Sequence, residues 1–235
     1  MQPFGTIRAV QTAGEDGVIF YTSGADLAAQ NQAITALNQA LMAHRPHWLT
    51  ELVPSYDSFM LVFNMSEVDY HGVYQFVKQL PVTGTTSQNA ATLHRLPVWY
   101  GAPEANDLEL VSNSTGLSAA EIIKRHQQSA YTVFAVGFAP GFAYLGELAP
   151  ELATPRLANP RKAVPQGAVA IADRQTAVYP DVSPGGWHLL GLCPVKLYNP
   201  GAEQPTLIKA GDQVEFYAIS EDEYHALAQK AGESA

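Results

Sequence analysis

The ten residues GFAPGFAYLG, at positions 137–146, open the stretch of sequence that decides the fold. Three glycines, one proline and three aromatic residues share these ten positions, and ten of the chain's 16 prolines lie between Pro140 and Pro205. Proline fixes φ and has no N–H to donate, so this part of the chain is incompatible with long helices. We therefore expect short strands joined by ordered loops there.

The first 90 residues carry a different pattern. Runs of β-forming residues between turn signals predict four strands: 6–12, 18–22, 48–53 and 58–63. Apolar residues at helical spacing predict two helices, from Asp26 as N-cap to about residue 44 and from about 68 to 80. The order ββαββα lacks regular βαβ alternation, so it predicts an α+β domain rather than a doubly wound sheet.

Residues 81–91, PVTGTTSQNAA, are small and polar and show no apolar periodicity, which is typical of a linker. We therefore predict two domains, a small α+β domain over residues 1–85 and a mainly-β domain over residues 92–235. In the second domain, Ser118 and Glu121 form the pattern of a capping box before a short helix. Strands are predicted around it at 93–100, 131–137 and 214–219, and a short helix at the C-terminus.

Composition excludes several classes of function. The chain has 235 residues, of which 13 are basic and 22 acidic, giving a net charge of −9 that disfavours binding to nucleic acid and to anionic membranes. The single cysteine, Cys193, cannot form an internal disulfide. Neither a signal peptide nor an uninterrupted apolar stretch of membrane-spanning length is visible, so we expect a cytoplasmic protein.

One window has the opposite charge balance. Residues 156–174 contain four basic residues and one acid, and two Pro-Arg pairs place Arg156 and Arg161 five positions apart. A positive patch beside glycine loops suits a small anion such as a carboxylate or a phosphate. The alternative is that these arginines hold loop carbonyls and neighbouring acids in place.

Several motifs occur together and in order along nearly the whole chain: ELVPSYDSFMLVF at 51–63, LPVWYG at 96–101, GFAPGFAYLGEL, PR…PR…VPQGAVAIA, QTAVYP and SPGGW. In this set the chain resembles the family of 5-oxoprolinase B subunits and KipI, also labelled allophanate hydrolase subunit 1. The resemblance implies an α+β N-terminal domain followed by a mainly-β cyclophilin-like barrel domain.

The resemblance also implies an activity and partners. In 5-oxoprolinase, such proteins act with a second cyclophilin-like protein, the C component, and with a third protein, the A component. Together these hydrolyse 5-oxo-L-proline to L-glutamate at the expense of ATP, so we expect a chain that is inactive alone. Two alternatives are a regulator that binds and inhibits a sensor histidine kinase and, more weakly, a component of allophanate or urea breakdown.

ATP with Mg²⁺ is the cofactor that the resemblance implies. The chain contains no GxxxxGK[ST] motif, so any nucleotide site is of another type. We expect that site to be shared with a partner protein.

Six residues are candidates for the chemistry. His126 matches the histidine that precedes the glycine-rich motif in the family and is a candidate base, although a histidine at a helix C-terminus also stabilises the helix dipole. Asp107 is the other catalytic candidate, with a turn residue as the alternative. The predicted substrate or anion ligands are Arg156, Arg161, Gln175 and Tyr179, of which the last two have buried strand positions as the alternative.

A loop that lines the site is predicted from the glycine and aromatic motifs. Glycine allows close approach of a ligand, and an aromatic side chain on such a loop forms a platform or fills a core. Its predicted members are Gly137, Phe138, Pro140, Gly141, Phe142, Tyr144, Gly146, Ser183, Gly185, Gly186 and Trp187. No metal ligands are assigned, because the histidines do not cluster in sequence.

Overall fold

The computed structural model describes residues 1–81 and 91–233, and the chain divides into two compact units, Met1–Ala90 and Ala91–Ala235. Most of the predicted linker, residues 82–90, lies outside the described residues. Each unit has a hydrophobic core of its own.

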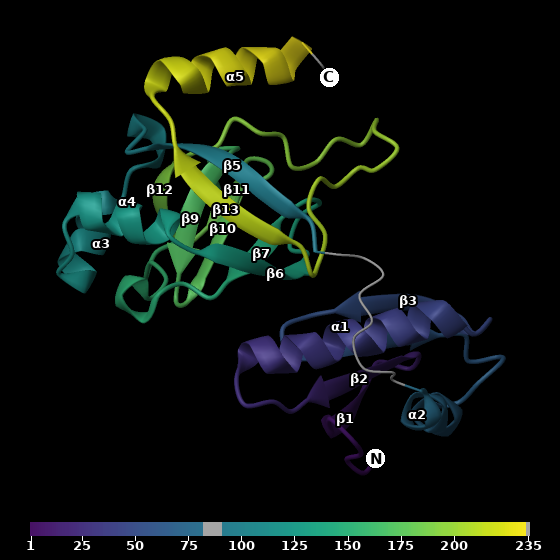
Figure 1. Cartoon of the computed structure of the whole chain (residues 1–235). Coiled ribbons are helices and arrows are strands. Elements are labelled where there is room, and N and C mark those ends of the chain that lie inside the picture. Colours follow the sequence, from purple (N-terminus) through teal and green to yellow (C-terminus); the bar gives the residue numbers. More distant parts are fainter. Residues whose placement is uncertain (82–90, 234–235) are drawn as a thin grey trace. The chain divides into compact units, whose positions relative to one another are not determined.

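The first unit is a four-stranded antiparallel sheet with two helices (Figure 1). Its elements are β1 (Ile7–Ala13), β2 (Gly17–Thr22), α1 (Leu27–His44), β3 (Leu49–Pro54), β4 (Ser58–Phe63) and α2 (Tyr70–Gln79), and the strand order is β1-β2-β4-β3. Alternate residues of the central strands are buried, and Phe20 and Phe59 stack with ring centroids 5.0 Å apart. Apolar residues of both helices pack into the same core.

Short-range signals determine where these helices start. The Asp26 side chain accepts a hydrogen bond of 2.8 Å from the Ala29 N–H, and the Asp69 side chain accepts one of 2.7 Å from the Gly72 N–H. Each carboxylate thus satisfies an N–H that has no partner inside the helix. The helix α1 ends at His44, two residues before Pro46, as the sequence predicts.

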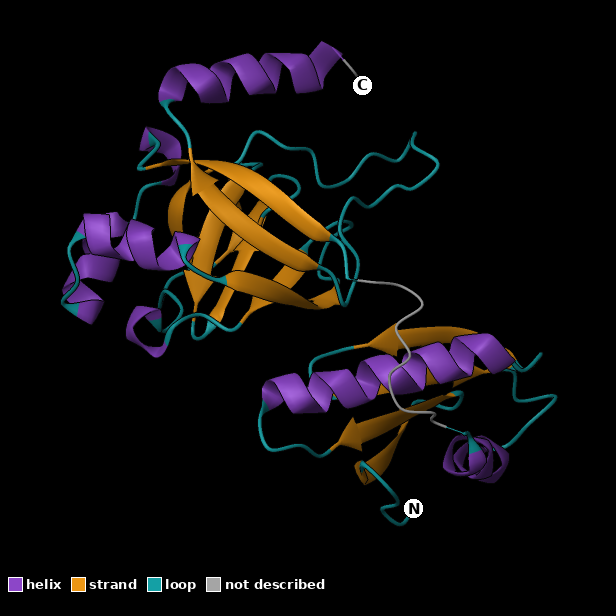
Figure 2. Ribbon diagram, viewed as in Figure 1, coloured by secondary structure: helices purple, strands orange, loops and turns teal. Residues whose placement is uncertain are grey.

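The second unit is built around a closed seven-stranded barrel (Figure 2). Its strands are β5 (Leu93–Tyr100), β6 (Ala130–Val136), β7 (Ala143–Gly146), β9 (Ala168–Ala172), β10 (Gln175–Val178), β12 (His188–Leu192) and β13 (Gln213–Ala218), in the order β10-β7-β6-β13-β5-β12-β9. The β13–β5 pair is parallel and the other pairs are antiparallel. The predicted α+β unit followed by a mainly-β barrel is therefore confirmed.

Short elements surround the barrel. They are the two-stranded sheet of β8 (Arg161–Val164) and β11 (Ser183–Gly185), the 3₁₀ turns η1 (Pro103–Ala105) and η2 (Pro150–Leu152), and the helices α3 (Leu108–Thr115), α4 (Ala119–Gln127) and α5 (Glu221–Glu233). The capping box of Ser118 and Glu121 is present at α4. The sequence did not predict α3. Its N-cap residue, Asp107, makes no side-chain capping bond, and its carboxylate accepts from Arg161 instead.

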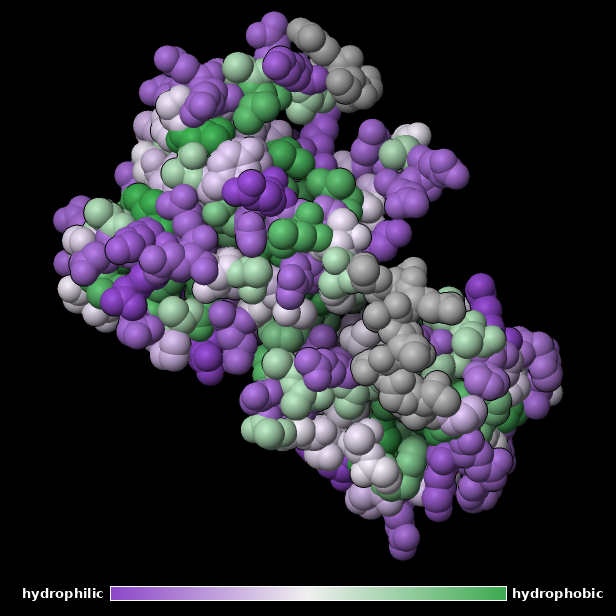
Figure 3. Space-filling model, in the orientation of Figure 1, coloured by the Kyte–Doolittle hydropathy of each residue, from purple (hydrophilic) through white to green (hydrophobic). Residues whose placement is uncertain are grey.

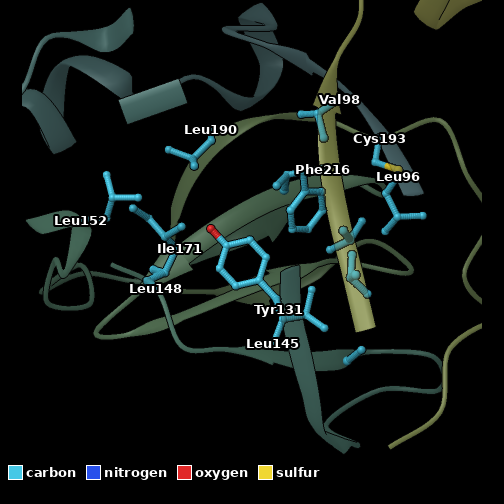
Figure 4. Close-up of a cluster of buried hydrophobic side chains, with 14 of the residues drawn as sticks. Leu96, Val98, Tyr131, Leu145, Leu148, Leu152, Ile171, Leu190, Cys193 and Phe216 are labelled. Atoms are coloured by element: carbon cyan, nitrogen blue, oxygen red, sulfur yellow. The ribbon is translucent and has the colours of Figure 1, made fainter. Parts of the chain in front are cut away.

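Large apolar side chains fill the barrel. Figure 4 shows Tyr131 and Phe216 inside it, among aliphatic residues that include Leu145, Ile171 and Leu190. Because this interior is packed with side chains, a ligand site has to be sought among the loops of the second unit.

The described residues include no helix that is long and apolar enough to cross a membrane. On the face shown in Figure 3, hydrophilic and hydrophobic residues are interspersed over the second unit.

Candidate functional site

The glycine-rich loop between β6 and β7 places an aromatic cluster beside the barrel. The ring of Phe142 lies 4.8 Å from Tyr144, 5.2 Å from Tyr179 and 5.9 Å from Trp187, each in an edge-on arrangement. Gly141 has a φ of +80°, and a Cβ there would lie 2.8 Å from the Cβ of Tyr198. Only glycine suits this position, so the Gly141 turn is what directs Phe142 inward.

Phe138, in the same loop, lies on the surface. Its φ is +75°, which is strained for a bulky residue, and 64% of the residue is exposed. Its ring contacts Phe142 edge-on with centroids 5.3 Å apart. The predicted loop is thus divided, since Phe142 and Trp187 are buried and Phe138 presents an aromatic ring outward.

Asp107 and Arg161 form an ion pair. The Nη2 atom of Arg161 lies 2.5 and 2.7 Å from the two carboxylate oxygens of Asp107, and the Leu189 N–H donates to the same carboxylate at 2.7 Å. A further guanidinium nitrogen of Arg161 donates to the Trp187 carbonyl at 3.2 Å. Both side chains are therefore occupied within the protein, and the geometry favours the alternative in which Arg161 holds an acid and a loop carbonyl.

Arg156 remains accessible. Its guanidinium lies 5.9 Å from the centroid of the Trp187 ring, and its distance to the Asp173 carboxylate is 3.9 Å, with both side chains more than half exposed. A pair of exposed charges at that distance is weak. Of the two arginines among the predicted ligands, Arg156 is the one whose charge is still available to an anion.

His126, on α4, has no exposed surface, and its ring stacks on Phe216 with centroids 4.6 Å apart. The Thr176 hydroxyl donates to the Ala170 carbonyl at 3.0 Å and accepts from His126 Nε2 at 2.8 Å, so Nδ1 accepts from the Tyr100 hydroxyl at 2.7 Å. Burial lowers the pKa of His126 from 6.5 to about 3. The imidazole is thus neutral and fully hydrogen-bonded in the core, and this placement does not support the predicted contact with substrate.

Other predicted residues lie in the barrel strands or in the aromatic cluster. Gln175 pairs with Ala172 and with Gly146 in the barrel, and Tyr179 is buried in the aromatic cluster. A Cβ at Gly185 would overlap the Tyr179 hydroxyl, which explains glycine at that position. Glycine at position 185 therefore makes room for the Tyr179 side chain rather than for a ligand.

Loops of the second unit line a cavity of about 560 Å³. Among the lining residues are Pro140, Gln166, Asp181, Ser183, Lys196 and Tyr198. The volume lies in the range of small-molecule pockets, about 300–1,000 Å³. Pro140 and Ser183 were predicted for the site loop. Sequence reasoning missed Gln166 and Lys196, although Gln166 belongs to the VPQGAVAIA motif.

The comparisons with known proteins identify the family. A family model described as "Carboxyltransferase domain, subdomain C and D" matches residues 8–208. The B subunit of 5-oxoprolinase from Bacillus subtilis (strain 168) is 34% identical over 228 residues, which cover 92% of this chain and 95% of that protein. The chain belongs to the family of 5-oxoprolinase B subunits.

Two solved structures place that family in a wider fold group. TTHA0988 is 34% identical with a TM-score of 0.77, and the match covers 87% of this chain but only 40% of that longer chain. The urea amidolyase of Kluyveromyces lactis matches 94% of this chain and 15% of its own, with a TM-score of 0.78 and 15% identity. At that identity the urea amidolyase shows a common fold and nothing about activity.

The resemblance implies Mg²⁺ with ATP, so the acidic side chains were compared with what a Mg²⁺ site needs. Within residues 1–81 and 91–233, no three His, Cys, Asp or Glu side chains gather in a way that could hold a metal ion. The Asp107 carboxylate, which was the best acidic candidate in the sequence, is paired with Arg161. The described residues therefore offer no cluster of three or more side chains that would hold Mg²⁺ without oxygens from a nucleotide or a partner protein.

Proposed function

We propose that this chain is the B component of a 5-oxoprolinase. In that role it is inactive alone and acts with an A component and a cyclophilin-like C component to hydrolyse 5-oxo-L-proline to L-glutamate at the expense of ATP. The observation that carries the proposal is the 34% identity to the Bacillus subtilis protein across 95% of its length. The longer TTHA0988 chain, of which this chain matches 40%, supports a role beside further polypeptide. The cytoplasm, where ATP is available, is the proposed location.

The charged side chains available in this chain indicate which protein binds the nucleotide. Magnesium is bound by carboxylates, and nucleotide phosphates are bound by clustered cations or N–H groups. Here Asp107 and Arg161 are paired with one another, and Arg156 is the accessible one of the two predicted arginine ligands. The proposal therefore assigns the nucleotide mainly to a partner protein, while this chain supplies Arg156 and the aromatic loop at the shared surface.

Reconstitution tests the proposal. This chain is purified with the A and C components from the same cell, and glutamate release from 5-oxo-L-proline is measured with each protein omitted in turn. Release is expected only when all three proteins, ATP and Mg²⁺ are present. Absence of release from the full mixture, with all three proteins folded, contradicts the proposal.

The regulatory alternative requires an exposed apolar surface that docks on a histidine kinase. Of the four aromatic residues in the predicted site loop, Phe142 and Trp187 are buried, Tyr144 is partly buried and Phe138 is exposed. A single exposed ring is a small patch. The enzyme-component proposal is therefore preferred, and autophosphorylation of a kinase is expected to be unchanged by this chain.

A further inference from the structure

The cavity of about 560 Å³ is lined by one basic side chain that has no partner within the described residues. Lys196 lines the cavity, and among the described residues its ammonium group takes part in no ion pair or hydrogen bond. The acidic side chain in the lining is Asp181, and among the described residues it forms no ion pair with Lys196. In a chain with a net charge of −9, an unpaired ammonium group beside a cavity favours a bound carboxylate.

Two side-chain amides in the same lining provide one hydrogen-bond acceptor and one donor. Gln166 uses its Nε2 atom to donate to the Pro180 carbonyl at 2.9 Å, which leaves its Oε1 as an acceptor. Asn199 uses its Oδ1 atom to accept from the Gly201 N–H at 3.0 Å, which leaves its Nδ2 as a donor. The cavity therefore presents one cation, one amide acceptor and one amide donor.

We propose that this cavity binds 5-oxo-L-proline, an inference that rests on the proposed function. Lys196 pairs with the carboxylate, the Gln166 Oε1 atom accepts from the lactam N–H, and the Asn199 Nδ2 group donates to the lactam carbonyl. The Asp181 carboxylate repels a second negative charge, so L-glutamate, a dicarboxylate, binds more weakly than 5-oxo-L-proline. Weaker binding of the product favours its release from this site.

Calorimetric titration of the full chain with 5-oxo-L-proline tests this assignment. Lys196→Met is expected to weaken binding by about tenfold or more, because a charge-assisted hydrogen bond is lost. Lys124→Met is the matched control, since Lys124 is an exposed lysine on α4 outside the cavity lining, and it should bind like the unchanged protein. The lactam 2-pyrrolidinone, which has no carboxylate, should bind equally to all three proteins.

Equal affinities of the Lys196→Met and Lys124→Met variants for 5-oxo-L-proline overturn the assignment, and so does a failure of the unchanged chain to bind it. The same variants in the reconstituted complex separate this inference from the proposed function. If the complex is active and Lys196→Met leaves its KM for 5-oxo-L-proline unchanged, the assignment of the cavity is wrong and the proposed function stands. If the chain binds 5-oxo-L-proline through Lys196 but the complex releases no glutamate, the proposed function is wrong and the assignment of the cavity stands. Circular dichroism of both variants verifies that they are folded.

Discussion

The guanidinium of Arg161 holds the carboxylate of Asp107, which lies 54 residues earlier in the chain. The pair links the start of α3 to β8, and the Leu189 N–H and the Trp187 carbonyl extend it to β12 and to the residue just before it. Two residues that were candidates for catalysis and for anion binding thereby join three separated segments of the second unit.

Arg161→Met is expected to lower the free energy of unfolding by about 2–4 kcal/mol, because it leaves the buried carboxylate of Asp107 without its cation. Urea unfolding followed by tryptophan fluorescence measures the change. Arg156→Met is the control, since an exposed pair contributes little, and it should stay within about 0.5 kcal/mol of the unchanged protein. Equal losses from the two variants would show that the ion pair does not stabilise the fold.

The buried histidine predicts a dependence of stability on pH. Burial lowers the pKa of His126 from 6.5 to about 3 in the folded chain. Its contribution to stability is therefore complete above pH 6.5 and is lost as the pH falls from 6.5 towards 3, because only the unfolded chain takes up the proton in that window. The slope from this group is about 1.4 kcal/mol per pH unit.

Denaturation at several pH values between about 4 and 7 measures that slope. The variant His126→Gln keeps a donor and an acceptor for Thr176 and Tyr100 but cannot be protonated, so its stability should depend less steeply on pH. The same slope in both proteins would mean that His126 is protonated in the folded state.

Gly185→Ala tests the contact with Tyr179. The added Cβ would overlap the Tyr179 hydroxyl, so the variant should lose about 1–3 kcal/mol of stability. Combining it with Tyr179→Phe removes the oxygen that the Cβ meets. Thermal unfolding of the two single variants and the double variant should therefore show losses that are less than additive, whereas strict additivity would contradict the contact.

Phe138→Gly tests whether the exposed ring contributes to binding of partner proteins rather than to stability. Glycine adopts a φ of +75° without strain, and the exposed ring loses only its contact with Phe142, so the melting temperature should change little or rise. If the ring docks on a partner protein, the same change should weaken co-purification with the A and C components. Phe142→Gly, which removes a buried ring, should instead unfold the loop, and unaltered co-purification by Phe138→Gly would remove this residue from the interface.

Local rules were sufficient for most of the elements. Asp26 and Ser118 cap helices as predicted, Pro46 follows the end of α1, and the prolines after residue 140 limit that region to short strands. Each of these effects acts within a few residues, so it can be read from sequence. The helix α3 was not predicted, and the long-range contact of its N-cap residue Asp107 with Arg161 could not be read from local rules.

The sequence by itself therefore determined the family, the α+β unit, the β-rich second unit and the loop that carries the glycine and aromatic motifs. Only the tertiary structure decided that His126 is a core residue, that Arg161 is paired while Arg156 is accessible, and that Lys196 and Gln166 line the same cavity. The physical reason is the tertiary packing of the second unit. It pairs β13 with β5, and it brings together side chains whose separation along the chain gives no periodic signal.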